Sequence, residues 1–179
     1  MPDLHVPVLA EEVVRHLMPV ETGLFVDATV GLGGHAAAVL QARPDLSLLG
    51  LDRDPQAIAR ASERLEPFTD RCTFVCSPFD RLFDILADAP MPRPVAILAD
   101  LGCSSLQLDT PGRGFSFSSE GPLDMRMGES GPSAADLVNN AGPEDLVMLL
   151  KDFGEERRAR AVVRALIRQR EQAPIRTTG

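Results

Sequence analysis

Four short apolar runs, separated by segments with helical periodicity, constrain the fold of this chain more than any other feature. The runs cover residues 24–29, 46–52, 72–76 and 95–100, and each resembles a strand buried on both faces. Helices are expected at 8–18, 35–42, 55–65 and 79–87, the third of them starting from Asp54 as N-cap and Pro55 in the first turn. This alternation predicts an α/β fold with a parallel sheet covered by helices on both faces.

The composition is that of an ordinary globular protein, since 44% of the 179 residues are hydrophobic and 25% are charged. It excludes a disordered or fibrous chain. The net charge of −8 excludes a general attraction to nucleic acids or anionic membranes. Residues 151–179 are an exception, because Lys151 and seven arginines there outnumber four acidic side chains. A nucleic-acid site would therefore be a local patch.

Cysteine usage favours a reducing compartment. The three cysteines, Cys72, Cys76 and Cys103, form an odd set, and the chain shows neither a signal segment nor an apolar stretch of about 18 residues. We expect a cytoplasmic protein that does not cross a membrane. Cys72 and Cys76 are interpreted as buried strand thiols. A metal site is the weaker alternative, because no second pair of ligands completes it.

Four features follow the predicted strands at the edge where a parallel sheet binds ligands. A glycine-rich loop with Gly31, Gly33 and Gly34 follows the first strand, and an acidic residue, Asp52, ends the second. Phe79 follows the third strand and Asp100 ends the fourth. Each has a structural alternative, namely a turn, a helix cap or a core residue. Together they predict a site for an adenosine-type cofactor, with the acid accepting hydrogen bonds from ribose hydroxyls.

The cofactor is expected to lack a pyrophosphate. The loop reads GLGG and not the full dinucleotide fingerprint, and no P-loop lysine follows it. S-adenosylmethionine carries a cationic ammonium and a sulfonium, which suit an acidic site holding Asp27, Asp52 and Asp100. An NAD-linked Rossmann oxidoreductase remains the alternative enzyme.

Seven segments resemble one family, and they occur in its order. They are HVPVL (5–9), VDATVGLGGH (26–35), GLDRDPQAI (50–58), ADLGCSSLQLD (99–109), RGFSF (113–117), GPLDMRM (121–127) and GEERRAR (154–160). The family is the bacterial ribosomal small-subunit methyltransferase H, or MraW, family. The resemblance implies a Rossmann-like fold and transfer of a methyl group from S-adenosylmethionine to N4 of a cytidine in the decoding region of 16S rRNA. The implied partner is the small ribosomal subunit, and a homodimer is a candidate assembly.

The resemblance also implies the cofactor-binding residues. These are Gly33, Gly34, His35, Asp52, Phe79, Asp100 and Gln107, of which His35 and Gln107 come from the resemblance alone. We hypothesise that Asp100 has the catalytic role of orienting the cofactor or the amine.

Family chains continue past the IRTT segment (175–178), whereas this chain stops at Gly179. The chain thus resembles the first four strands of the methyltransferase domain (1–108), followed by a connecting loop and the opening of a helical substrate-recognition domain (109–179). The fourth strand would have an unpaired edge. A non-catalytic fragment that binds only cofactor or RNA is therefore a third hypothesis.

Candidate RNA-binding residues lie in the second part of the chain. Phe115 and Phe117 are candidates for stacking on a base that leaves its helix, or else for filling a domain junction. Further candidates, all arginines, are Arg113, Arg126, Arg157, Arg160, Arg164 and Arg168. The first two have Asp109 and Asp124 as alternative partners. The last four form a stripe on a helix expected at 155–170, opposite an apolar face of Ala159, Val162, Val163, Leu166 and Ile167, and a solvated face is the alternative.

Overall fold

The computed structural model describes residues 7–179, so that His5 and Val6 of the first motif lie outside the described residues. The chain divides into two compact units, Met1–Ser104 and Ser105–Gly179, which are described separately. Within the described residues, no helix has the length and apolarity needed to cross a bilayer.

The first unit contains the predicted parallel sheet, with strand order β3-β2-β1-β4. Its strands are β1 (Gly23–Asp27), β2 (Leu46–Asp52), β3 (Cys72–Cys76) and β4 (Pro94–Leu98). The bounds of β2 and β3 are those predicted. β1 and β4 each end two residues earlier than predicted. Asp100 therefore lies in the loop after β4. The α/β fold with Rossmann-like topology is confirmed.

The helices of the first unit are α1 (Ala10–Leu17), α2 (Gly34–Ala42), α3 (Pro55–Arg64) and α4 (Leu82–Asp88). Two 3₁₀ turns, η1 (Glu66–Arg71) and η2 (Phe79–Arg81), precede β3 and α4. The helix predicted from Phe79 therefore begins as a 3₁₀ turn. The predicted start of α3 is confirmed, because the Asp54 side chain accepts a hydrogen bond from the Gln56 amide at 3.0 Å.

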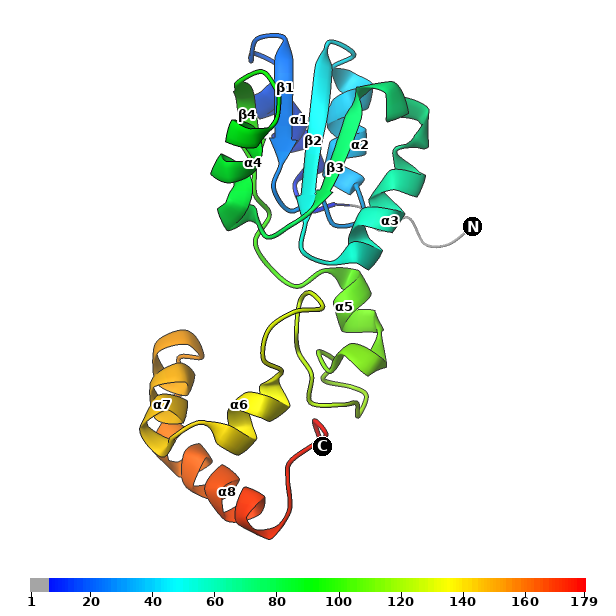
Figure 1. Cartoon of the computed structure of the whole chain (residues 1–179). Helices are drawn as coiled ribbons and strands as arrows, with labels where there is room; N and C mark the ends of the chain where they lie inside the picture. Colours follow the sequence, from blue (N-terminus) through cyan, green and yellow to red (C-terminus); the bar gives the residue numbers. More distant parts are fainter. Residues whose placement is uncertain (1–6) are drawn as a thin grey trace. The chain divides into compact units, whose positions relative to one another are not determined.

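Helices cover the two faces of the sheet unequally (Figure 1). Alternate residues of β1 point to opposite faces, with Phe25 in the core beneath α1, α2 and α3 and Val26 in the core beneath α4. Because β3 and β4 are the edges of the sheet, they are only partly buried. The interpretation of Cys76 as a buried thiol is therefore wrong, since its side chain is exposed.

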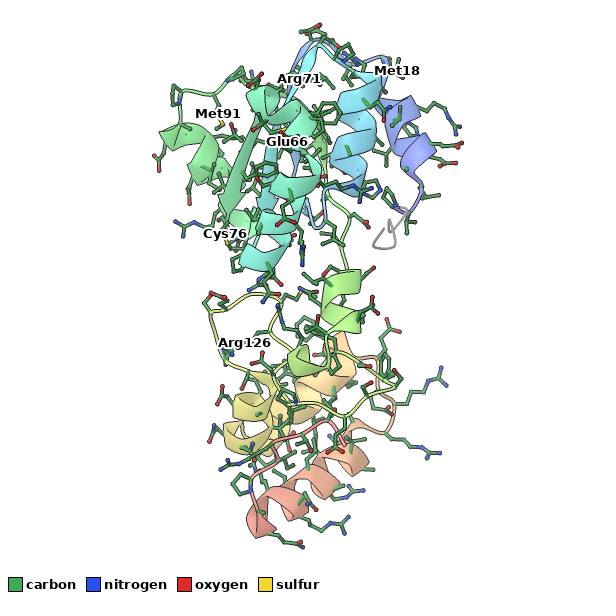
Figure 2. The ribbon with its side chains drawn as sticks, turned by 90° about the vertical axis from the view of Figure 1, so that its right-hand side faces the viewer. Met18, Glu66, Arg71, Cys76, Met91 and Arg126 are labelled. Carbon is green, nitrogen blue, oxygen red and sulfur yellow. The ribbon has the colours of Figure 1, made fainter. Side chains whose placement is uncertain are left out.

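Two arginines hold the amino-terminal end of the sheet. The Arg43 guanidinium donates to the carbonyls of Leu17, Met18 and Val20 and to the carboxylate of Asp45. Arg71 donates to four further carbonyls, from Leu40, Arg43, Pro44 and Leu46. Figure 2 shows Arg71 and Met18 at one end of this unit and Cys76 at the other. Cys76 therefore marks the end at which the candidate ligand site lies.

The second unit is built from short helices joined by long loops. They are α5 (Ser105–Asp109), η3 (Pro111–Arg113), α6 (Ala134–Asn140), α7 (Pro143–Met148), the π-helical turn η4 (Leu149–Phe153) and α8 (Ala159–Gln172). α5 is not among the predicted helices. The helix expected at 155–170 instead spans Ala159–Gln172, and an isolated antiparallel bridge pairs Pro122 with Thr177.

Candidate functional site

The candidate site lies at the carboxyl end of the parallel sheet. β4 lies beside β1 on the side opposite β2, so that the strand order reverses next to β1. Connections leave such a point in opposite directions and open a crevice for ligands. The predicted residues of the first unit follow strand ends at this edge. Hydrogen bonds show how most of them are held.

The Asp52 carboxylate joins the glycine loop to the turn before α3. Its Oδ2 accepts a hydrogen bond from the Gly31 amide at 3.0 Å, and its Oδ1 accepts one from the Asp54 amide at 2.9 Å. Burial raises the pKa of Asp52, although these two bonds oppose that shift. Each carboxylate oxygen can accept a second hydrogen bond. Asp52 therefore has a structural role in the loop and can also accept from two ribose hydroxyls.

The three loop glycines have different reasons to be glycine. A Cβ at Gly33, where φ is +74°, would lie 3.2 Å from Leu65 Cδ1, and one at Gly34 would lie 3.2 Å from Pro7 Cγ. Gly31 has φ +51°, and among residues 7–179 a Cβ there would meet only the Thr29 carbonyl oxygen, at 3.8 Å. Packing within the protein thus accounts for Gly33 and Gly34, whereas Gly31 has the open side that a ligand needs.

His35 connects the amino-terminal segment to the end of β4. Its Nε2 lies 2.7 Å from the Val8 carbonyl oxygen and therefore carries the proton. Its Nδ1 lies 4.0 Å from Asp100 Oδ2. The Asp100 amide donates to Thr29 Oγ1 at 2.8 Å. Neither Thr29 nor Val8 was predicted as a site residue, and the only available signal was a hydroxyl residue at the end of the predicted strand 24–29.

Asp27 is the most deeply buried carboxyl group at this edge. Only 1% of its surface is exposed, and its Oδ1 accepts a hydrogen bond from the Thr29 amide at 3.2 Å. Its Oδ2 has no hydrogen-bond partner among residues 7–179. Burial raises the pKa of Asp27 to about 7, despite the opposing effects of the Thr29 amide and His35. The acidic site expected from three carboxylates is therefore less negative near neutral pH, and Asp27 lies beneath its surface.

The residues present suit an adenosine ligand with a cationic end. Asp52 offers acceptors for hydroxyls, Gly31 leaves its side open, and the Asp100 side chain is more than half exposed. Residues 27–35 contain no lysine or arginine that would bind a phosphate. Phe79 follows β3 and is 51% exposed, which leaves its ring available for contact with an apolar ring.

Gln107, Arg113 and Arg126 belong to the second unit and hold its loop. The buried Gln107 amide donates to the Met127 carbonyl at 3.0 Å. Arg113 donates to the carbonyls of Arg126 and Met127. The Arg126 guanidinium binds Asp124 at 2.6 Å and lowers the pKa of that carboxyl group. Arg126 was predicted either to bind RNA or to pair with Asp124, and the pair with Asp124 is observed.

The remaining predicted RNA-binding side chains are more accessible. The Phe117 ring is fully exposed, whereas Phe115 is partly buried. Arg157, Arg160, Arg164 and Arg168 are all exposed. On the opposite face of α8, Ala159 and Val163 are buried and Leu166 and Ile167 are partly buried. The prediction was wrong for Val162, which is exposed because it lies at the border between the two faces.

Comparison with known proteins gives one consistent result. A family model described as the MraW methylase family matches residues 3–179. The chain is 48% identical to a ribosomal RNA small subunit methyltransferase H from Nocardioides sp. and 45% identical to one from Bradyrhizobium diazoefficiens. These alignments cover 98% and 97% of this chain, but 56% and 53% of those proteins. The chain thus spans about half the length of the curated relatives it matches.

Similarity to solved structures is weaker. An rRNA methylase from Streptococcus thermophilus is 20% identical with a TM-score of 0.39, over 53% of this chain and 49% of that chain. This similarity is too low to support an inference about function.

Proposed function

Because this chain belongs to the MraW methylase family, we propose that it binds S-adenosylmethionine and acts in methyl transfer to ribosomal RNA. The observation that carries the proposal is the Asp52 carboxylate held against the Gly31 amide, at the point where the strand order reverses. An acidic residue there receives ribose hydroxyls, while the open side of Gly31 admits the ligand to the backbone. The matched relatives are named as rRNA methyltransferases, which supports the RNA substrate.

The motif resemblance narrows the proposed substrate to N4 of a cytidine in the decoding region of 16S rRNA, within the small ribosomal subunit. RGFSF and GPLDMRM, next to the DLGCSS segment, support this choice. In this interpretation residues 1–108 form part of the cofactor-binding domain and residues 109–179 begin the helical substrate-recognition domain.

The reaction requires help because the cytosine amine is a poor nucleophile, with its lone pair delocalised into the ring. S-adenosylmethionine, when bound, supplies an electrophilic methyl group on a sulfonium. The protein must hold the amine in line and accept its hydrogen bonds as the nitrogen becomes tetrahedral. The Asp100 carboxylate is exposed and faces His35, and its backbone amide is held by Thr29. Asp100 is the group proposed to orient the amine or the cofactor.

The second unit is proposed to bind the RNA. A base must leave its stack to reach the methyl group, and the fully exposed Phe117 ring offers a surface for it. The exposed arginines Arg157, Arg160, Arg164 and Arg168 are the candidates for contact with the RNA backbone. Arg113 and Arg126 are proposed to act indirectly, because their guanidinium groups already hold the loop between them.

Replacing Asp52 by alanine is expected to weaken S-adenosylmethionine binding about 100-fold or more, because two charge-assisted hydrogen bonds to ribose are lost and Gly31 loses its acceptor. Isothermal titration calorimetry measures this directly, and it suits a chain without tryptophan or tyrosine. The control is Asp70→Ala, an exposed carboxylate in η1, before β3, which should bind as wild type does. Equal affinity of Asp52→Ala and wild type would contradict the proposed site.

The same titration with NAD tests the alternative oxidoreductase. We expect no NAD binding, since the loop lacks the second half of the dinucleotide fingerprint. Binding of NAD but not of S-adenosylmethionine would overturn the proposed function. Binding of S-adenosylmethionine without methyl transfer to unmodified small subunits would support the non-catalytic fragment.

Replacing Asp100 by asparagine is expected to lower the rate of methyl transfer about tenfold or more, with a smaller effect on cofactor affinity. Asparagine keeps the shape of the side chain and removes the charge that faces His35. Single-turnover transfer of a labelled methyl group to unmodified small subunits gives the rate, and calorimetry gives the affinity. A variant with the full wild-type rate would eliminate any role for this charge.

A further inference from the structure

Two sets of basic side chains in this protein differ in whether they already have partners. Those of Arg43, Arg71, Arg126 and Arg170 are bound to backbone carbonyls or carboxylates within their own unit. A second group lies close together in the second unit and consists of Lys151, Arg157, Arg158, Arg160 and Arg164. No carboxylate among residues 7–179 lies within ion-pair distance of these five side chains. Their charges are therefore available to a ligand.

These five side chains line a single hollow of about 640 Å³ between η4 and the start of α8. Two carboxylates, those of Glu155 and Glu156, also line it, so the cations outnumber them. The Glu156 carboxylate already accepts a hydrogen bond from the Arg158 amide at 2.6 Å. The hollow is a concentrated positive site on a chain whose net charge is −8.

The backbone around the hollow is irregular on both sides. Lys151 is carried by the π-helical turn η4, a kind of turn that often occurs at functional sites. Glu155 has φ +50°, in the left-handed region that costs a non-glycine residue free energy. α8 begins without a side chain that caps its first turn. Strained backbone persists where the surrounding structure holds it, and it is common at binding sites.

We propose that this hollow binds a phosphate group of the RNA backbone. Guanidinium groups bind phosphate oxygens in pairs of parallel hydrogen bonds, and four of the five cations are arginines. Lys151 adds a point charge from η4. The proposal rests on the proposed function for its ligand, because a ribosomal RNA substrate supplies the phosphate. It adds Lys151 and Arg158, which the arginine stripe of α8 does not include.

RNA binding in the hollow and RNA binding along the stripe would be weakened by different substitutions. Arg168 belongs to the stripe but does not line the hollow, whereas Lys151 lines the hollow from a different helical segment. If the stripe bound along the RNA backbone, Arg168 would contribute as much to binding as Arg160. A pocket for one phosphate would use Lys151 and Arg160 instead.

The test is binding of a fluorescently labelled 20-nucleotide RNA of mixed sequence, measured by anisotropy over a range of KCl concentrations. Neutralising one phosphate contact lowers the slope of log affinity against log salt by about 0.7 for single strands. For Lys151→Gln combined with Arg160→Gln, we expect a clearly flatter slope and an affinity about tenfold lower at low salt. Arg176→Gln, an exposed arginine of the same unit outside the hollow, is the matched control and should bind as wild type does.

Each other outcome overturns the proposal. An unchanged slope in the double variant excludes the hollow. An equal loss with Arg168→Gln alone assigns binding to the stripe, and competition by polyglutamate as effective as by RNA indicates an acidic protein ligand. Absence of RNA binding by wild type also overturns it. Far-ultraviolet circular dichroism of the same preparations confirms that the variants are folded, and calorimetry with S-adenosylmethionine decides separately whether the proposed function fails.

Discussion

Replacing Asp27 by asparagine is expected to remove a pH-dependent part of the free energy of unfolding. In the wild type, this part falls by roughly 2 to 3 kcal/mol between pH 5 and pH 8. In the folded protein, burial raises the pKa of Asp27 to about 7, while an aspartate in an unfolded chain titrates near pH 3.9. As the pH rises between these values, the unfolded state loses this proton first. The stability contributed by the protonated carboxyl group is therefore complete below about pH 4 and is lost as the pH rises through 7.

Urea unfolding followed by far-ultraviolet circular dichroism, at several pH values, measures this effect. The groups that act on Asp27 are His35, Asp52 and Asp100, and they remain in the variant, so the difference between the two profiles isolates Asp27. Asp70→Asn, at an exposed position, should keep the wild-type profile. Parallel profiles for wild type and Asp27→Asn would show that the buried carboxyl group does not titrate in this range.

Replacing Gly114 by alanine is expected to destabilise the second unit by about 2 to 5 kcal/mol. Gly114 has φ +74°, and a Cβ there would overlap the Pro122 carbonyl oxygen. That oxygen is backbone, so it cannot move away as a flexible side chain would. The RGFSF and GPLDMRM segments are thus in backbone contact, and the hydrogen bond from the Met125 amide to the Arg113 carbonyl at 3.0 Å supports the same contact.

Gly112 provides the matched control for this prediction. Apart from its chain neighbours, no atom of residues 7–179 would lie within 4 Å of a Cβ at Gly112, so Gly112→Ala should change stability by no more than about 0.5 kcal/mol. Hydrogen exchange measured by mass spectrometry separates the units, and we expect faster exchange in peptides from 105–179 of Gly114→Ala. If Gly114→Ala and Gly112→Ala exchange alike, the contact does not contribute to stability.

Local patterns were sufficient for much of the fold. The apolar runs of β2 and β3 coincide with the observed strands, and Asp54 with Pro55 marks the start of α3. These signals are short-range, because a buried strand needs a continuous apolar run and a helix needs a capping acceptor near its first amides. The irregular geometry was not predicted, because short-range signals carry no information on distant contacts. The π-helical turn η4 and the late start of α8 depend on contacts that periodicity does not encode.

For the candidate site, too, the sequence predicted one part and only the fold revealed the other. Its position at the strand ends followed from residue order, as did the choice of Asp52 and Asp100. Their partners did not follow, because the amides of Gly31 and Asp100 reach Asp52 and Thr29 across 21 and 71 residues of sequence. The sequence gives no reason to distinguish the three loop glycines. In the fold, Gly33 and Gly34 pack against other residues, whereas Gly31 has an open side.

The sequence by itself determined the alternation of strands and helices, the family, and which chemical groups follow each strand. Only the tertiary structure decided that Asp27 is buried with a raised pKa, that Arg43 and Arg71 bind carbonyls, and that five cations of the second unit line one hollow. The physical reason is that periodicity reports which face of an element is apolar. Burial, hydrogen-bond partners and pKa depend instead on which distant segments the fold brings within a few ångströms of a side chain.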